Sequence, residues 1–297
     1  MNKAGMMKDW EDSVGAAGTD ALHFIDGKWV KGDPYLLRAF DHATWLMGGI
    51  FDGARAFEGV TPDLDLHCQR AVRSARNMGL ASPLSAGEIQ EIALDGVAKF
   101  PAGSALYIRP FMWSTAGWMA PDPASTRIVI SLTPEPMPEP KGSSVMLSRF
   151  RRPSPETAPT DAKAVCLYAQ AGRAAGEATA KGFNDAVMLD PLGNVAEFSS
   201  ANLWIAKDGA AITPAPNGCF LNGLTRQRLV RLLVAAGIPV HERTFGFQEV
   251  LEADEVFSSG NFGKVLPIIK VEDREKPIGP IFTAARRLYW DFAHSRN

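Results

Sequence analysis

The 297-residue sequence contains only three cysteines, Cys68, Cys166 and Cys219, and no CxxC pair. An odd number of widely spaced cysteines excludes a disulfide framework and a cysteine-rich zinc site, and it indicates reduced thiols in a cytoplasmic protein. The five histidines show no metal-ligand spacing, so we expect no metal site.

Long hydrophobic runs and an excess of one charge are also absent. No 18 consecutive apolar residues occur, which excludes a membrane-spanning helix. Residues 1–22 lack the pattern of a secretory signal, and we expect them to form a flexible N-terminal arm. Lys and Arg number 31 against 33 Asp and Glu, a net charge of −2, whereas a general nucleic-acid binder is strongly basic. We therefore expect neither a nucleic-acid nor a membrane partner.

A proline-rich segment divides the chain. Residues 133–143, TPEPMPEPKGS, contain four prolines and one glycine, which is typical of an interdomain linker. We expect a small N-terminal α/β domain over residues 23–132 and a larger C-terminal domain over residues 144–297.

Helices and strands follow one another without a strict βαβ order. In the first domain the pattern predicts a hairpin at Asp26-Gly27, a helix over 65–78, a second helix after a Ser85/Glu88 capping box, and strands at 49–57, 104–113 and 126–133. In the second it predicts a strand at 144–150, a helix at 165–180, an antiparallel meander over 185–215, and a helix from about Thr225 to Gly237. This mixture predicts an α+β fold in two domains.

Common catalytic motifs are missing, since the sequence has no GxxxxGK, no GxGxxG after a strand, no HExxH and no GxSxG. Two isolated residues stand out instead. Lys163 lies among apolar neighbours, and a partly buried lysine is a candidate nucleophile, although most lysines lie on the surface. Glu197 lies within an apolar strand, where it either faces solvent or, if buried, requires a cationic partner.

Several segments could bind an anion. Gly223, Leu224 and Thr225 begin a helix whose free amides suit an anion, although Thr225 could act only as the N-cap. The turn within 258–263 offers further amide donors, or else is an ordinary loop. Arg70 and Arg109 could bind a phosphate or a carboxylate. Arg70 lies on a helix and could equally be a surface charge, whereas Arg109 alternates with apolar neighbours on a strand, where a charge needs a role. A lysine, a strand carboxylate and several anion-binding groups together match the needs of pyridoxal phosphate.

At these residues the sequence resembles the fold-type IV pyridoxal-phosphate enzymes, which share the D-amino-acid-aminotransferase-like fold, and most closely the branched-chain amino acid aminotransferases. Eight strings occur in the family order between residues 23 and 285: FDGARAF, HCQRAVRSA, LYIRPF, TDAKAVCLYAQ, FNDAVMLD, NVAEFSSANLW, LNGLTRQRL and EADEVFSSGN. The resemblance implies a two-domain enzyme with its active site between the domains. It also implies a homodimer, because the apolar loop STAGWMAPDP enters the partner's site in relatives.

The resemblance assigns roles around the cofactor, pyridoxal 5′-phosphate. Lys163 matches the lysine that forms the internal aldimine and moves the proton in a ping-pong reaction. Tyr168 matches the partner of the phenolic oxygen, and Glu197 matches the acid that pairs with the pyridinium nitrogen. The remaining matches to cofactor-binding positions are Arg70, Ser200, Leu224, Thr225 and Asn261.

The resemblance also assigns a substrate side. Tyr107 matches a residue that assists the substrate carboxylate, and Arg109 matches the receiver of the distal carboxylate of glutamate. The other matches to the substrate pocket are Phe51, Gly53, Arg55 and Phe262. The implied reaction moves the amino group of a branched-chain L-amino acid to 2-oxoglutarate.

Three positions depart from the branched-chain pattern. Leu46 replaces a tyrosine, Ala201 replaces a glutamate, and Asn261 replaces a threonine. The Ser199-Ser200 pair is similar to that of D-amino-acid and R-selective amine transaminases, which are therefore the alternative function. An aminodeoxychorismate-type lyase is a more distant alternative, and a vitamin-binding protein without turnover belongs to a different class.

Overall fold

The structure is a computed structural model, and it describes residues 20–295. Most of the expected N-terminal arm, residues 1–19, lies outside the described residues. The chain divides into two compact units, Met1–Pro136 and Met137–Asn297, and this boundary falls inside the proline-rich segment. The segment is not linker throughout, because strand β6 continues to Pro134 and thus includes its first two residues.

The first unit contains an antiparallel sheet in the order β2-β1-β6-β5-β3, with β4 also paired to β5. Asp26 and Gly27 both have positive φ, as a two-residue turn between β1 and β2 requires, so the predicted hairpin is confirmed. The strands are β1 (Leu22–Ile25), β2 (Lys28–Lys31), β3 (Gly49–Phe51), β4 (Ala54–Ala56), β5 (Leu106–Ser114) and β6 (Thr126–Pro134).

The single strand expected over residues 49–57 is wrong, because β3 and β4 are separate strands. Both pair with β5, and their registers place Asp52 opposite Pro110. Asp52 donates its N–H to the Pro110 carbonyl at 3.0 Å, but proline has no N–H with which to return the bond. The missing bond explains why the ladder breaks at Asp52 and Gly53.

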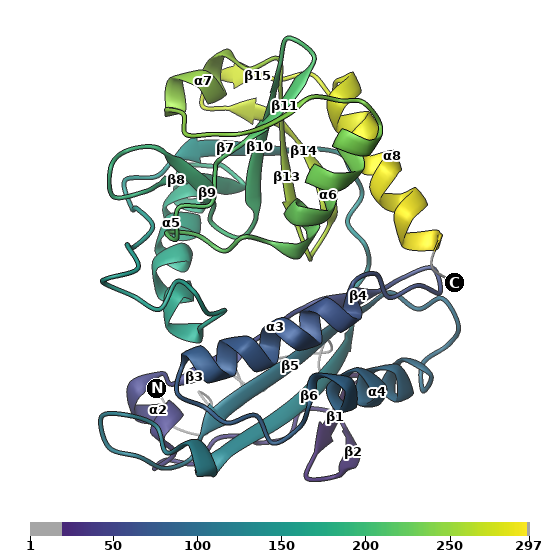
Figure 1. Cartoon of the computed structure of the whole chain (residues 1–297), viewed down its shortest axis with the longest axis vertical. Coiled ribbons are helices and arrows are strands. Elements are labelled where there is room, and N and C mark those ends of the chain that lie inside the picture. The colour runs from purple at the N-terminus through teal and green to yellow at the C-terminus, as the bar shows by residue number, and fades with distance from the viewer. Residues whose placement is uncertain (1–19, 296–297) are drawn as a thin grey trace, which may run out of the picture. The chain divides into compact units, whose positions relative to one another are not determined.

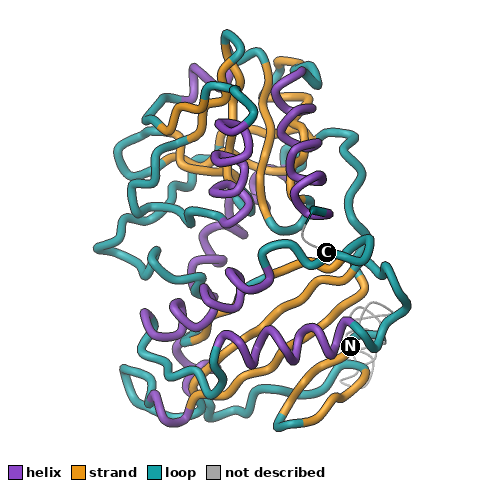
Figure 2. Tube along the Cα trace, turned by 45° about the vertical axis from the view of Figure 1, so that its right-hand side comes forward, coloured by secondary structure: helices purple, strands orange, loops and turns teal. Residues whose placement is uncertain are grey.

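Helices cover one face of this sheet (Figures 1 and 2). Helix α3 (Leu64–Asn77) and helix α4 (Ala86–Val97) pack against a core that includes Ile50, Ile108 and Leu132. The predicted capping box is confirmed, since the Ser85 side chain accepts from the Glu88 N–H and Glu88 accepts from the Ser85 N–H. Two shorter segments lie outside this layer, namely α2 (His42–Leu46) and the 3-10 turn η1 (Pro123–Ser125).

The second unit contains a larger sheet in the order β12-β11-β10-β13-β14-β7-β8-β9, with β15 paired to β14. Its strands are β7 (Ser143–Leu147), β8 (Asp185–Leu189), β9 (Val195–Phe198), β10 (Asn202–Lys207), β11 (Ala210–Thr213), β12 (Val240–Glu242), β13 (Glu255–Gly260), β14 (Lys264–Val271) and β15 (Arg274–Glu275).

The continuous meander expected over residues 185–215 is wrong at its centre. Strands β8 and β9 pair, and so do β10 and β11, but the second neighbour of β10 is β13 rather than β9. A tight turn closes between Phe198 and Ala201, and the N–H of Ser199 bonds back to Ala186 on β8. The stacked rings of Trp204 and Phe257 belong to the β10–β13 pairing that the chain adopts instead.

Helices flank this second sheet. Helix α6 (Leu224–Ala235) contacts α8 (Pro280–His294) and β13, while α5 (Tyr168–Ala180) packs on β8 (Figure 1). Shorter segments are η2 (Val165–Leu167) and α7 (Phe247–Glu252). The fold is therefore α+β, as predicted. Among residues 20–295, no helix has the length and apolar character needed to cross a membrane.

Candidate active site

Lys163 and Tyr168 form a hydrogen-bonded pair in the second unit. Ala162 and Ala164 are buried and fix the backbone on both sides of Lys163, whose own side chain is half-buried, as its apolar neighbours predict. The short turn η2 then leads into α5, which begins at Tyr168. Lys163 Nζ donates to Tyr168 Oη at 2.6 Å, so the phenol oxygen holds the amine in place.

Glu197 is buried, which decides between the two alternatives left open by its position in an apolar strand. Every residue of β9 is buried, and the Glu197 side chain is only 9% exposed. Its Oε1 lies 3.1 Å from Nε of Arg152, and its Oε2 accepts from Nδ2 of Asn202 at 3.2 Å. The cationic partner that a buried carboxylate requires is therefore Arg152.

Charged neighbours, Lys163 among them, act on the pKa of Glu197. Burial raises the pKa of Glu197 to about 7, against the opposing charges of Arg152 and Lys163, while Asp185 adds to the rise. The Lys163 amine is therefore near enough for its charge to act on Glu197. An acid that titrates near neutral pH can hold a proton or stabilise a nearby cation.

Asn202 connects Glu197 to the start of α6. Besides its bond to Glu197, its Nδ2 donates to the Leu221 carbonyl at 2.8 Å, and its Oδ1 accepts from the Gly223 N–H at 3.1 Å. A Cβ on Gly223 would lie 2.2 Å from that Oδ1. Only glycine therefore lets the helix start approach the Asn202 amide so closely.

The N-terminus of α6 has the features of an anion site. Its N-cap is Gly223, which has no side chain to bond the first amides, so the interpretation of Thr225 as N-cap is wrong. Leu224 and Thr225 are instead the first two helical residues, and Thr225 is buried. Their position at the positive end of a 12-residue helix favours an anionic group there.

Asn261 lies at the same end of the sheet. Asn202 pairs with Ser259 across β10 and β13, and Asn261 follows two residues later, one residue past the end of β13. The loop expected over 258–263 thus begins at Asn261, because Ser258–Gly260 belong to the strand. The Nδ2 of Asn261 is buried and has no hydrogen-bond partner among residues 20–295. A buried donor in this place can bond an anion.

Ser200 and Phe262 border a cavity of about 260 Å³ that Gly260 and Lys264 also line. The Ser200 hydroxyl lies 3.4 Å from Oδ2 of Asp185, and Ser199 donates to the other oxygen of that carboxylate. Burial raises the pKa of Asp185, although these hydroxyls lower it. Phe262 is half-exposed at the cavity.

In the first unit, Arg70 is buried rather than on the surface. Its Nε and Nη2 donate to the two oxygens of Asp52 at 2.7 and 2.8 Å, and Asp52 also bonds Nδ1 of His67 at 2.7 Å. Burial alone would raise the pKa of Asp52, but Arg70 and His67 hold it well below its usual range. The predicted role of Arg70 at a phosphate stays a prediction.

Among the described residues, no group of His, Cys, Asp and Glu is arranged to hold a metal ion.

The expected substrate residues of the first unit share one face of its sheet. Arg55 pairs with Tyr107, and Phe51 pairs with Phe111 two positions beyond Arg109. The exposed Arg109 guanidinium stacks over the Phe51 ring, with its carbon Cζ 4.6 Å from the ring centroid. Arg55 is fully buried and donates to the Glu135 carbonyl, and burial lowers its pKa. Gly53 is buried at the break between β3 and β4.

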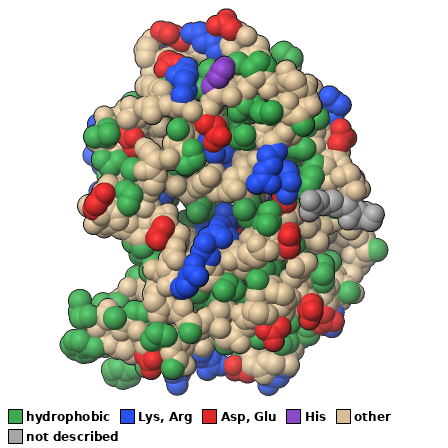
Figure 3. Space-filling view, in the orientation of Figure 1, with side chains coloured by type: hydrophobic (Ala, Val, Ile, Leu, Met, Phe, Trp, Pro, Cys, Tyr) green, Lys and Arg blue, Asp and Glu red, His purple; other side chains and the backbone are tan. Residues whose placement is uncertain are grey.

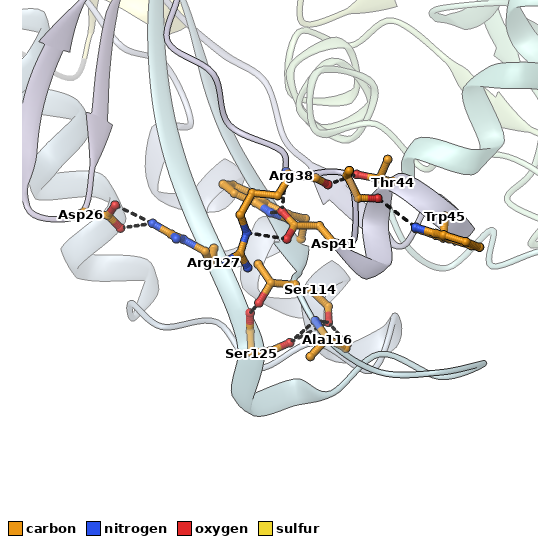
Figure 4. A network of polar contacts seen from close by, with 12 residues as sticks. Asp26, Arg38, Asp41, Thr44, Trp45, Ser114, Ala116, Ser125 and Arg127 are labelled. Atoms are coloured by element: carbon orange, nitrogen blue, oxygen red, sulfur yellow. Dashed lines mark hydrogen bonds and ion pairs between the residues drawn. The ribbon is translucent and has the colours of Figure 1, made fainter.

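Leu46 lies in an exposed apolar patch, which we call the α2 patch. It comprises the residues around a cavity of about 310 Å³: Phe40, His42, Trp45, Leu46, Gly117, Trp118 and Met119. Polar contacts hold its two halves, with Asp41 bonding Arg38 beside α2 and Ser114 bonding Ser125 across the base of the loop (Figure 4). Four large side chains remain 67–87% exposed: Phe40, Trp45, Trp118 and Met119.

Two residues of the site were not found from the sequence. Arg152 follows Arg149 and Arg151, which are exposed, so nothing in the local pattern separates it from them. Asn202 carried a usable signal, because it begins an apolar strand just as Glu197 lies within one. A buried amide, like a buried acid, must find hydrogen-bond partners.

The chain is similar to known aminotransferases in sequence and in fold. Residues 49–271 match the amino-transferase class IV family. A branched-chain-amino-acid aminotransferase of Pseudomonas aeruginosa is 30% identical over 94% of this chain and 95% of its own length. The structure resembles an aminotransferase from Brucella abortus bound to PLP, with 46% identity, a TM-score of 0.91, and coverage of 92% and 99% of the two chains. It also resembles the Escherichia coli branched-chain enzyme, with 25% identity, a TM-score of 0.86, and coverage of 94% and 96%.

Proposed function

Since the chain belongs to the amino-transferase class IV family and is a pyridoxal-phosphate-dependent aminotransferase, we propose that it transfers the amino group of an L-branched-chain amino acid to 2-oxoglutarate by a ping-pong route. The observation that carries the proposal is the Lys163 amine, held 2.6 Å from Tyr168 and acting electrostatically on the buried acid Glu197. The relative from Pseudomonas aeruginosa supports the choice of amino donor.

The residues present fit pyridoxal phosphate. The cofactor needs an amine, an acid at its ring nitrogen and donors for its phosphate. Lys163 and Glu197 supply the first two, and the start of α6 with the buried Nδ2 of Asn261 supplies the third. We propose that Tyr168 bonds the ring oxygen, that Arg70, Leu224 and Thr225 assist at the phosphate, and that Ser200 borders the ring.

When bound, the cofactor supplies an electron sink that stabilises negative charge at the substrate α-carbon. The protein's part is to move and hold protons. The Lys163 amine would accept the proton that leaves the substrate α-carbon and would later donate it again. Tyr168 fixes the position of the Lys163 nitrogen. Glu197, kept in place by Arg152 and Asn202, presents negative charge to a protonated ring nitrogen. A cation placed there favours the ionised form of Glu197, whose pKa of about 7 then falls.

The sheet face of the first unit supports the proposed substrates. Phe51 offers an aromatic surface that suits a branched aliphatic side chain. Arg109, stacked on that ring and exposed, offers a guanidinium for the second carboxylate of 2-oxoglutarate, and Tyr107 and Arg55 adjoin it on the same face. We propose that Gly53 and Phe262 complete the substrate pocket.

A donor panel tests this function. Purified protein with added pyridoxal phosphate is supplied with leucine, isoleucine or valine and 2-oxoglutarate, and glutamate is measured. Glutamate formation that disappears in Lys163→Ala supports the proposal, and Lys181→Ala, an exposed lysine on the same unit, is the matched control. Absence of glutamate with all three donors contradicts it.

The same panel decides the alternative function. Ser199 and Ser200, which resemble the D-amino-acid and R-amine enzymes, both direct their hydroxyls at Asp185. Turnover of D-alanine or an R-arylamine in place of leucine would favour this alternative. Release of pyruvate from an aminodeoxychorismate-type substrate would favour the lyase.

We also propose that the enzyme is a homodimer. The α2 patch forms part of the hydrophobic surface at the lower left of Figure 3, where Figure 1 places α2 and the loop before β6. Large exposed apolar patches are typical of association surfaces. Sedimentation should give twice the chain mass, and Trp118→Ser should shift the protein toward monomer. A monomeric wild-type protein would contradict this.

The three free cysteines support the proposed cytoplasmic location.

A further inference from the structure

Lys264 is a buried lysine in the turn between β13 and β14, beyond the residues assigned to the cofactor. Its side chain is almost fully buried, at 1% exposure, and its φ of 60° lies in the left-handed region that favours glycine. It pairs with Gly260 across the turn that carries Asn261. A left-handed backbone in a non-glycine residue and a buried amine both cost free energy, so the surrounding structure must hold this lysine in place.

The contact between Lys264 and Asn261 fixes which way the Asn261 amide points. Lys264 Nζ lies 2.8 Å from the Asn261 side chain. An ammonium group can only donate, so the atom that it contacts must be the amide oxygen. The other end of the amide, Nδ2, is then a donor, and it is buried without a partner among residues 20–295. The amine thus keeps the amide oxygen on the Lys264 side, and Nδ2 stays on the opposite side of the amide.

Asn261 lies at the end of the sheet to which the proposed site assigns the phosphate. Asn261 and the first turn of α6 lie at the same end of the β10–β13 pair, as the bonds of Asn202 show. An amide oxygen facing a phosphate would repel it, whereas Nδ2 donates to it. A neighbouring ammonium also draws electron density from the amide and strengthens Nδ2 as a donor.

We propose that Lys264 is a positioning residue for the phosphate group: it orients Asn261 so that Nδ2 bonds a phosphate oxygen. This proposal rests on the proposed cofactor site and extends it to a residue that does not itself touch the ligand. It also accounts for an asparagine at this position, because an amide offers one acceptor to Lys264 and one donor to the anion.

The test compares two ligands of the apoprotein by calorimetry, pyridoxamine 5′-phosphate and pyridoxamine. Neither is an aldehyde, so neither reacts with Lys163, and the ratio of their dissociation constants measures the contribution of the phosphate. We take the ratio as the dissociation constant of pyridoxamine divided by that of pyridoxamine 5′-phosphate. In Lys264→Met we expect this ratio to fall about tenfold, the size of one charged hydrogen bond, with pyridoxamine binding unchanged. In Lys264→Arg, which keeps a cationic donor, we expect the ratio to stay within about threefold. An unchanged ratio in Lys264→Met overturns the proposal.

Two further variants separate orientation from other effects. Lys264→Gly relieves the left-handed backbone, so a fall in the ratio there cannot come from backbone strain, and this variant serves if Lys264→Met does not fold. In an Asn261→Ala background, Lys264→Met should change the ratio less than about twofold. A full tenfold change in that background would show that Lys264 acts on the phosphate directly and would overturn the positioning role.

Failure of this inference differs from failure of the proposed function. If wild-type apoprotein binds neither pyridoxamine 5′-phosphate nor pyridoxal phosphate, the cofactor site itself is wrong. If it binds both and Lys264→Met retains the full phosphate contribution, only the role of Lys264 is wrong.

Discussion

Asn202 Nδ2 donates to Oε2 of Glu197 at 3.2 Å, and the other end of the same amide accepts from the backbone of α6. One side chain therefore fixes both the buried acid and the helix start. In the proposed function these groups meet the ring nitrogen and the phosphate of one cofactor. A change in Asn202 or in the backbone that it contacts should consequently affect both ends of the site.

Substitution of Gly223 tests this link. In Gly223→Ala the new Cβ would lie 2.2 Å from Asn202 Oδ1, so the amide must shift. We expect the free energy of unfolding to fall by about 1–3 kcal/mol, as for other overpacked sites. The matched control is Gly246→Ala, at the N-cap of α7, where a Cβ meets nothing within 4 Å. Urea unfolding measures both, and equal losses in the two variants would contradict the close contact.

The contribution of the Arg152–Glu197 ion pair to the free energy of unfolding should depend on pH. Arg152→Met removes a charge that lowers the pKa of Glu197, so that pKa should rise further above 7. We expect the apoprotein to lose about 3 kcal/mol at about pH 8.5, where the buried carboxylate would be unpaired. At about pH 6 the loss should be smaller, because Glu197 is protonated in both proteins. Urea unfolding at both pH values measures it, and a loss independent of pH would contradict the pairing.

The raised pKa of Glu197 also predicts how apoprotein stability changes with pH. Its pKa is about 7 in the folded protein against 4.5 as the reference, so between these values the folded state holds a proton that the unfolded state has lost. Stability should therefore fall as pH rises from about 4.5 to about 7, by on the order of 2–3 kcal/mol. Glu197→Gln should remove this fall. If the variant and the wild-type protein follow the same curve, Glu197 is not the titrating group.

Arg109 should matter for the acceptor more than for the donor. It is exposed and stacked on Phe51, so Arg109→Leu removes a guanidinium without leaving a buried charge unpaired. We expect KM for 2-oxoglutarate to rise about 10- to 100-fold, the range for a lost charged hydrogen bond, and KM for leucine to change little. Arg149→Leu, an exposed arginine stacked on Phe150 in the second unit, is the control. Equal rises for both substrates would contradict the assignment.

Local sequence pattern predicted the features that depend on neighbours along the chain. The Ser85/Glu88 capping box, the Asp26-Gly27 hairpin and the half-burial of Lys163 depend on residues within five positions of one another. The pattern also identified Glu197 as a carboxylate that needs a partner if buried, because an acid in an apolar strand stands out.

Features that depend on distant contacts could not be predicted in this way. Arg152 and Glu197 are separated by 44 residues in the sequence, and no local pattern joins them. The pairing of β10 with β13 rather than β9 likewise depends on which strand reaches it in the folded sheet. The break at Asp52 depends on Pro110 in another strand.

The central claim is that Lys163 carries the cofactor, and one measurement tests it most directly. The protein is saturated with pyridoxal phosphate and reduced with borohydride, which makes the bond to lysine permanent, and its peptides are then analysed by mass spectrometry. The account predicts the added phosphopyridoxyl mass on the peptide that contains Lys163 and on no other lysine. A modified peptide elsewhere, such as one containing Lys264, or no modified peptide at all, would contradict it.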